Sequence, residues 1–246
     1  MSEAIETLQK YLSDKTNIIH YYGNDALVKK LFDALYNGTI HDYEAPDMYV
    51  KYEKEIWLIE HFEIDCYKHN RKGSAYRIEQ NRVDQKFEHV TPSNNGTVFH
   101  ETIEGTSSYE DYVSNVKNSF LMHYCKIDNY KQSLIDKNIA VENTKFVVMF
   151  LIDDVSPLGT SYIDKKGKWR PIFLSNCKEF LDILNNSPNV DCVLSTSCSS
   201  REKYIWFIDR NNLDEHYKNA EDYKNGEFVA FKPHVIGGKI IIPNDK

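Results

Sequence analysis

Residues 46–65 read PDMYVKYEKEIWLIEHFEID and are the most informative part of the chain. They contain two runs with the apolar and aromatic content of β-strands, at 47–52 and 55–66, separated by the turn residues Glu53 and Lys54. The second run is apolar on both faces at its start, which is typical of a strand that is covered on both sides. The stretch therefore predicts two antiparallel strands, connected by a short turn, inside a sheet.

Helical and strand patterns alternate on both sides of this stretch. Apolar periodicity and capping residues predict helices at residues 3–13, 24–38, 75–88, 109–137 and 175–186. Strands are predicted at residues 145–154, 190–195 and 203–209. We also expect a long loop at 91–108 that could contain one short strand, a hairpin at 161–173 and a closing hairpin that turns at Gly237-Gly238. This order predicts an α/β protein.

Length and composition limit what the chain can be. Its 246 residues correspond to roughly 1.6 average domains, and because no linker pattern interrupts them we expect one domain over residues 1–246. A formal charge of −7 argues against a general polyanion binder, although one local basic strip would be compatible with it. No apolar run approaches the 18 or so residues of a membrane span. Five cysteines without a CxxC pair predict a reduced, cytoplasmic protein.

Three side chains with ligand chemistry follow one another on the second strand. Because side chains alternate along a strand, His61, Glu63 and Asp65 project to one face. Crowded carboxylates repel each other unless a cation or a proton lies between them. Carboxylate oxygens suit Mg²⁺ or Mn²⁺, so this face is a candidate metal site.

A Pro-Asp at the start of one strand, followed by acidic positions on the next, resembles the PD-(D/E)XK nuclease superfamily. The resemblance implies a restriction-endonuclease-like fold with a mixed central sheet flanked by helices. Its core would cover residues 24–153, and residues 154–246 would add strands and hairpins to the same sheet. In that family two carboxylates hold a divalent metal that activates water against a phosphodiester, and a lysine supports the reaction.

The family's functional positions can be matched to this sequence one by one. Asp47 matches the aspartate and Glu63 the glutamate, and both would bind Mg²⁺ or Mn²⁺. Asp65 stands where the family has its lysine; Asp65 or His61 would be a third ligand or would orient the attacking water, and Lys68 would stabilise the developing charge. Contacts to nucleic acid would come from the loop and helix that follow, at Arg71, Lys72 and Arg77.

The strand register leaves one alternative open. A tight two-residue turn places Asp47 opposite Glu60, on the other face from Glu63. A loop one residue longer or shorter places Asp47 opposite His61 or Ile59, on the face of Glu63. The sequence favours Glu63, because its Glu-x-Asp alternation is followed directly by a basic loop.

These observations support three hypotheses about function. The first is a metal-dependent nuclease that hydrolyses phosphodiester bonds in nucleic acid. The second is a catalytically inactive binding module of the same fold, from a phage-defence or mobile element, which the missing lysine and the acidic balance favour. The third is a different metal enzyme centred on Asp153 and Asp154, although this pair would equally cap the turn that follows its strand. A second basic group, with an aromatic residue for stacking, lies at Lys165, Lys166, Lys168, Trp169 and Arg170.

Overall fold

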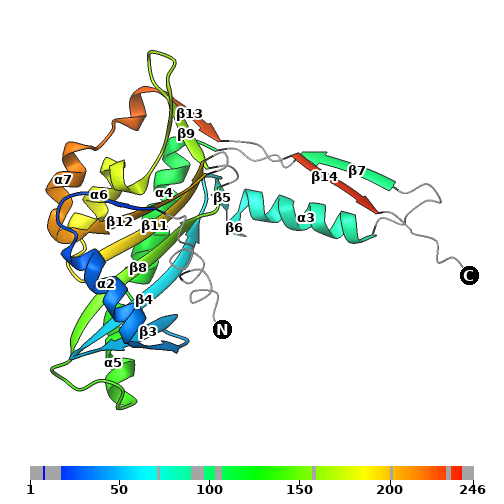
Figure 1. Ribbon diagram of the computed structural model, residues 1–246. Coiled ribbons are helices and arrows are strands. Elements are labelled where there is room, and N and C mark those ends of the chain that lie inside the picture. Colours follow the sequence, from blue (N-terminus) through cyan, green and yellow to red (C-terminus); the bar gives the residue numbers. More distant parts are fainter. Residues whose placement is uncertain are drawn as a thin grey trace, which may run out of the picture.

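A mixed seven-stranded sheet with the order β1-β12-β11-β8-β4-β3-β2 forms the centre of the protein (Figure 1). The structure, a computed structural model, describes Leu8 and residues 18–70, 73–89, 97–102, 107–156, 159–199, 202–230 and 234–239. The strands are β1 (Ile19–Tyr21), β2 (Thr39–Asp42), β3 (Met48–Tyr52), β4 (Glu55–Ile64), β8 (Lys145–Asp154), β11 (Cys192–Ser199) and β12 (Glu202–Asp209). β8 runs parallel to both β4 and β11, and β1 runs parallel to β12, while the other pairs are antiparallel.

Helices cover both faces of this sheet, so the chain has two apolar cores. Helix α2 (Ala26–Asn37) buries Val28, Leu31 and Ala34 against one face, where Trp57 and Met149 also lie. The opposite face packs against α4 (Tyr109–Tyr124), α5 (Ile127–Asp136), α6 (Lys178–Asn185) and α7 (Leu213–Lys218). Coverage on both sides explains why β4 and β8 are apolar in nearly continuous runs.

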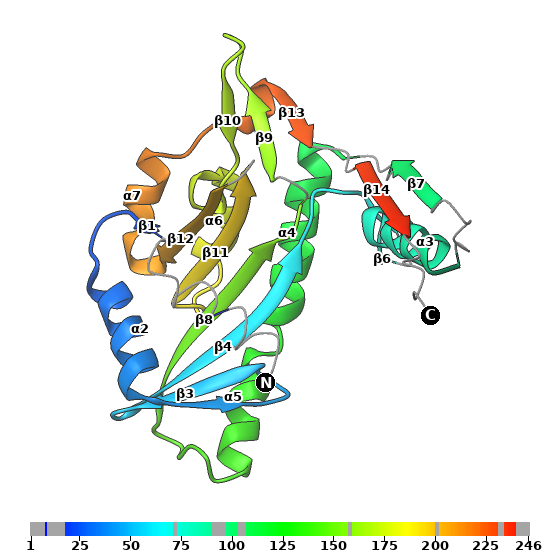
Figure 2. The same cartoon turned by 45° about the vertical axis from the view of Figure 1, so that its right-hand side comes forward.

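Smaller elements extend from the carboxyl ends of β4 and β8. A three-stranded sheet consists of β9 (Thr160–Ile163), β10 (Trp169–Pro171) and β13 (Glu227–Ala230). Helix α3 (Ala75–His89) and the pair formed by β7 (Thr97–Thr102) and β14 (His234–Lys239) stand off to one side of the main sheet (Figures 1 and 2). The remaining short elements are β5 (His69–Asn70), β6 (Gly73–Ser74) and the 3-10 turns η1 (Leu174–Asn176), η2 (Arg210–Asn212) and η3 (Tyr223–Asn225).

The α/β class, the mixed central sheet and its flanking helices are as expected from the sequence. The strands at 47–52, 55–66, 145–154, 190–195 and 203–209 are confirmed, as are the hairpin at 161–173 and the helices at 24–38, 75–88 and 175–186. Of the helix expected at 3–13, only Leu8 is described, and it is helical and buried on the α2 face. Within the described ranges, no helix is long and apolar enough to cross a membrane.

Three expectations need correction. The helix expected at 109–137 is two helices, α4 and α5, interrupted at Cys125 and Lys126. The closing hairpin at Gly237-Gly238 is wrong, because both glycines lie inside β14, which pairs with β7, while β13 pairs with β9. Residues after 153 do not all join the central sheet: β11 and β12 extend it, but β9, β10 and β13 form a sheet of their own.

Candidate functional site

The turn between β3 and β4 settles which acidic residue lies beside Asp47. Tyr52 pairs with Glu55 across a two-residue turn, and Met48 pairs with Ile59, so Asp47 comes opposite Glu60. The amide N of Asp47 donates to Glu60 Oε2 at 3.3 Å. The amide N of His61 in turn donates to Asp47 Oδ2 at 2.7 Å. Asp47 and Glu60 are therefore neighbours, and the expected partnership with Glu63 is not formed.

Glu60 is the centre of a buried polar cluster beneath the junction of α4 and α5. Its Oε1 accepts hydrogen bonds from Tyr130 OH and from His123 Nδ1, both at 2.6 Å. The His123 ring lies parallel to Phe62, with ring centroids 4.6 Å apart. Burial raises the pKa of Asp47, and burial together with the bond to Glu60 raises the pKa of Tyr130. We call Asp47, Glu60, His123 and Tyr130 the Glu60 cluster.

Glu63 lies on the opposite face of β4, four residues after Ile59 of the α2 core. Its Oε2 accepts a hydrogen bond from Arg77 Nη2 of α3 at 2.6 Å. Asp153 of β8 is its register partner, and Thr196 of β11 is the next residue across and donates to Asp153 Oδ1. The carboxyl ends of three parallel strands thus carry a polar row on one face.

Asp65 lies just beyond β4 and is 1% exposed. Its Oδ1 accepts from the amide N of Tyr67 at 2.9 Å and lies 3.3 Å from His69 Nε2. Its Oδ2 has no hydrogen-bond partner among the described residues and is 3.8 Å from Arg77 Nε. Arg77 therefore bridges Glu63 and Asp65, so this arginine, expected to contact nucleic acid, pairs with protein carboxylates.

Two other residues of the expected site, Lys68 and His61, are among the described residues. Lys68 is exposed, and Arg71 and Lys72 lie outside the described residues. His61 shares the face of Glu63, and its buried Nε2 meets no hydrogen-bond partner in the described part of the chain. Among the described residues, no three His, Cys, Asp or Glu side chains are grouped in a way that could hold a metal ion. A metal shared by Asp47 and Glu63 does not fit, since they project from opposite faces of the sheet.

Asp153 and Asp154 also project to opposite faces. Asp154 is buried, accepts a hydrogen bond from Tyr112 OH at 3.1 Å, and accepts the amide of Ser156 at 2.9 Å. Burial raises its pKa to about 6. The hydrogen bond from the Ser156 amide means that Asp154 caps the turn after β8. This is the turn-capping role that the sequence analysis set beside the metal-site hypothesis for Asp153 and Asp154.

The second basic group lies at the tip of the β9–β10 hairpin, as predicted. Asp164 organises this tip by accepting the amides of Lys166 and Lys168 at 2.8 and 3.0 Å, which lowers the pKa of its carboxyl. A hollow beside it is lined by Tyr162, Asp164, Lys165, Lys166, Lys168, Arg170 and Asp222. Four cations and two carboxylates give this hollow a net formal charge of +2, in a chain whose overall charge is −7.

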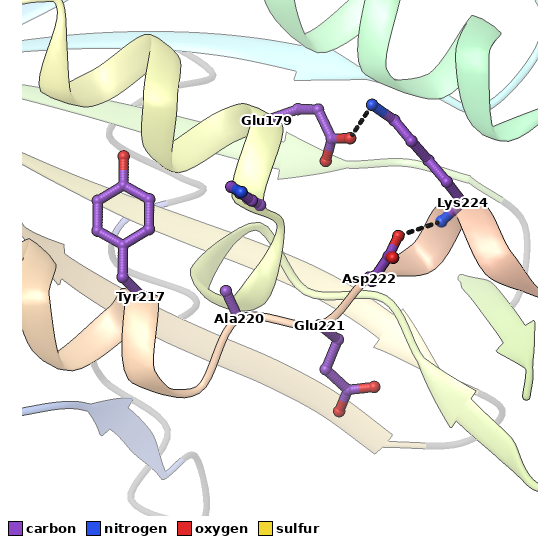
Figure 3. A pocket seen from close by; sticks show the side chains of 7 residues that line it. Glu179, Tyr217, Ala220, Glu221, Asp222 and Lys224 are labelled. Atoms are coloured by element: carbon purple, nitrogen blue, oxygen red, sulfur yellow. Dashed lines mark hydrogen bonds and ion pairs between the residues drawn. The ribbon is translucent and has the colours of Figure 1, made fainter.

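A second hollow between α6, α7 and η3 was not suggested by the sequence (Figure 3). Two lysines and three carboxylates line it, for a net formal charge of −1; Lys224 Nζ lies 2.8 Å from Glu179 Oε1, and the Lys224 amide donates to Asp222 Oδ1 at 3.2 Å. Cys177 Sγ lies 3.8 Å from Glu179 Oε2, and burial raises the pKa of its thiol to about 11, which argues against a reactive nucleophile.

The sequence alone did not reveal the partners of Glu60. His123 and Tyr130 are seven residues apart, the spacing of one helix face, and this was the available signal. No known protein family, curated protein or solved structure matches this chain.

Proposed function

We propose that this chain is a nucleic-acid-binding module that does not cleave its ligand, and that the tip of the β9–β10 hairpin is its contact surface. The order α2, β2-β3-β4 meander, α4 and parallel β8 agrees with the helix, three strands, helix, strand order of the PD-(D/E)XK core. This agreement supports a relationship to restriction-endonuclease-like proteins, whose ligands are nucleic acids.

The engagement of the carboxylates supports binding without cleavage. In this register Asp47 and Glu60 occupy the places of the family's two acidic residues, and Phe62 stands two residues after Glu60, where a lysine is expected. Phe62 is 6% exposed and packs between the rings of His123 and Phe150. Glu60 already accepts three internal hydrogen bonds, so a ligand would have to displace some of them.

The observation that carries the proposal is the basic tip of the hairpin. Lys165, Lys166 and Lys168 are exposed, and none of them forms an ion pair with a described carboxylate. Arg170 is held by Glu221, with Nη1 and Oε1 3.1 Å apart. Clustered lysines on a protruding hairpin can contact successive phosphates, and such contacts do not require a basic protein as a whole.

The test is the affinity for labelled oligonucleotides, measured by fluorescence anisotropy at several salt concentrations. We expect Lys165→Glu with Lys166→Glu to weaken binding by about tenfold or more at low salt. For a single strand, the slope of log K against log salt should fall by about 0.7 for each phosphate contact that is lost. The same samples, incubated with Mg²⁺ or Mn²⁺, should contain uncut DNA and RNA.

A matched control carries the same change of charge at the far end of the sheet. Lys51→Glu with Lys54→Glu reverses two exposed lysines on β3 and its turn, and it should leave the affinity unchanged. Equal losses in both double variants would mean that only net charge matters, which contradicts a hairpin site. Cleavage that disappears in Glu63→Ala would instead favour the nuclease hypothesis.

A further inference from the structure

Four aromatic rings are in contact along the β1 edge of the main sheet. The His20 ring of β1 stacks on Trp206 of β12, with centroids 5.0 Å apart and planes at 30°. Phe173, just after β10, lies 5.7 Å from Trp206 and 4.9 Å from Tyr204. We call His20, Phe173, Tyr204 and Trp206 the aromatic strip.

The aromatic strip is only half-buried. Ile205 and Phe207, on the other face of β12, are 0% and 1% exposed, whereas all four rings of the strip retain intermediate exposure. Aromatic residues that serve only as core tend to be covered, as Phe120 and Phe180 are in this protein. The Nε1 of Trp206 is buried, and none of the residues that the structure describes accepts a hydrogen bond from it. The strip therefore offers partly accessible ring surface at the sheet edge.

The strip lies at the base of the hairpin that carries the lysines at its tip. Phe173 follows β10 by two residues, and Trp169, at the other end of β10, is 53% exposed. Figure 2 shows the hairpin above the carboxyl ends of β8 and β11, and β12 begins at that same end because it is antiparallel to β11. The lysines and Phe173 thus lie within residues 165–173, Tyr204 and Trp206 lie on β12, and His20 lies on the neighbouring β1.

We infer that the aromatic strip is a base-stacking platform and that the nucleic acid bound by this chain is single-stranded. The inference rests on the proposed function and names the class of its ligand. In a duplex the faces of the bases are already stacked on one another, whereas a single strand exposes them. Every base has a π-face, so aromatic side chains beside a basic groove bind single strands with little sequence preference. The positive charge of the hairpin makes an anionic chain the complementary occupant.

The test compares three probes of equal length: a single-stranded oligonucleotide, its abasic counterpart with the same phosphates, and the duplex. We expect the base-containing single strand to bind about tenfold or more tightly than the abasic one, because stacking needs bases. Tyr204→Leu should abolish this difference while leaving the salt dependence intact. Tyr204→Phe keeps the ring and should preserve it.

Further measurements distinguish a loss of binding from a loss of folding in these variants. Circular dichroism and the unfolding midpoint of each variant establish that the sheet is intact, and His20→Ala repeats the test from the short edge strand. Tyr36→Leu is the matched control, because Tyr36 is 77% exposed on α2, away from the strip.

Each outcome decides between the two proposals. Equal affinity for abasic and base-containing strands, with binding still lost in the lysine variant, overturns the stacking platform and leaves the proposed function standing. Tighter binding of the duplex also overturns it. If the ring variants change stability but not affinity, the strip is covered by another part of the chain and the inference fails. No binding of any probe removes the proposed function itself.

Discussion

Glu60 and Glu63 are three residues apart on β4 but have different surroundings. Glu60 faces the α4–α5 side, is 6% exposed and accepts hydrogen bonds from two side chains. Glu63 faces the other side and pairs with Arg77, whose side chain is 49% exposed. A one-residue change in register would have exchanged their environments. The two-residue turn of β3–β4 therefore decides which of them is structural.

Glu60→Ala should destabilise the protein by about 3 kcal/mol, because it leaves His123 and Tyr130 without their buried acceptor. Glu63→Ala removes a partly exposed ion pair and should cost no more than about 1 kcal/mol. Urea denaturation of both variants measures the difference. Equal losses would show that the Glu60 cluster does not hold α4 and α5 against the sheet.

Asp154 should make stability depend on pH. Burial raises its pKa from an ordinary 3.8 to about 6, so the folded protein keeps this proton at a pH where the unfolded chain has lost it. The free energy of unfolding contributed by this group therefore falls as pH rises from about 4 to about 6, by about 3 kcal/mol in total. Asp154→Asn cannot ionise and should flatten the curve in this window. Parallel curves for the two proteins, measured by denaturation at each pH, would contradict this role.

At the scale of elements, the break between α4 and α5 is a helix end that the local sequence pattern does not predict. Apolar spacing is regular through residues 109–137, so the sequence predicts one helix. In the structure the helix ends at Tyr124 and restarts at Ile127. His123 and Tyr130, on either side of the break, both reach Glu60. Glu60, the acceptor that His123 and Tyr130 share, lies on a strand some 60 residues earlier. The apolar periodicity of residues 109–137 therefore cannot predict where the helix breaks.

The end of α2 offers a test of close packing between a helix and a strand. Gly38 has φ −84°, which any residue can adopt, so conformation does not require glycine there. A Cβ would instead lie 2.7 Å from Val50 Cγ1 and 2.8 Å from Lys51 O, and would collide with Ala34 O. We expect Gly38→Ala to cost about 3 kcal/mol, because backbone atoms cannot give way.

Asn37→Ala is the neighbouring control for this change. Asn37 is exposed, so its replacement should change the free energy of unfolding by no more than about 0.5 kcal/mol. Thermal or urea unfolding compares the two. If Gly38→Ala were as harmless as Asn37→Ala, the contact between α2 and β3 would be looser than the structure indicates.

Strands with strong local patterns were predictable, and distant pairings were not. KFVVMFLIDD gives β8 directly, because an apolar run of this length between polar loops has few alternatives. Gly237-Gly238 imitates a hairpin turn, yet β14 pairs with β7, more than 130 residues earlier in the chain. For the candidate site, the sequence identified the acidic residues of β4 but not which of them shares a face of the sheet with Asp47. That face depends on the pairing register of β3 and β4, which one residue more or less in the turn would change.

At the scale of the whole molecule, charge is separated rather than balanced. The chain carries 37 acidic and 30 basic residues, yet the hairpin tip gathers three lysines without paired carboxylates among the described residues. Acidic surfaces elsewhere would repel a polyanion and limit its contact to this end of the sheet. The net charge of the chain therefore conceals a local concentration of lysines that can form a binding surface.

The pairing of β1 with β12 has a consequence for how the protein is made. Ile19–Tyr21 lie beside Ile205–Phe207, so the edge of the sheet joins segments from opposite ends of the chain. Such a contact closes a long loop and is expected late in folding, after the β4–β8–β11 interior has formed. On the ribosome, β1 emerges early and has no partner until β12 has been synthesised. The contact between His20 and Trp206 can therefore form only once synthesis has passed β12.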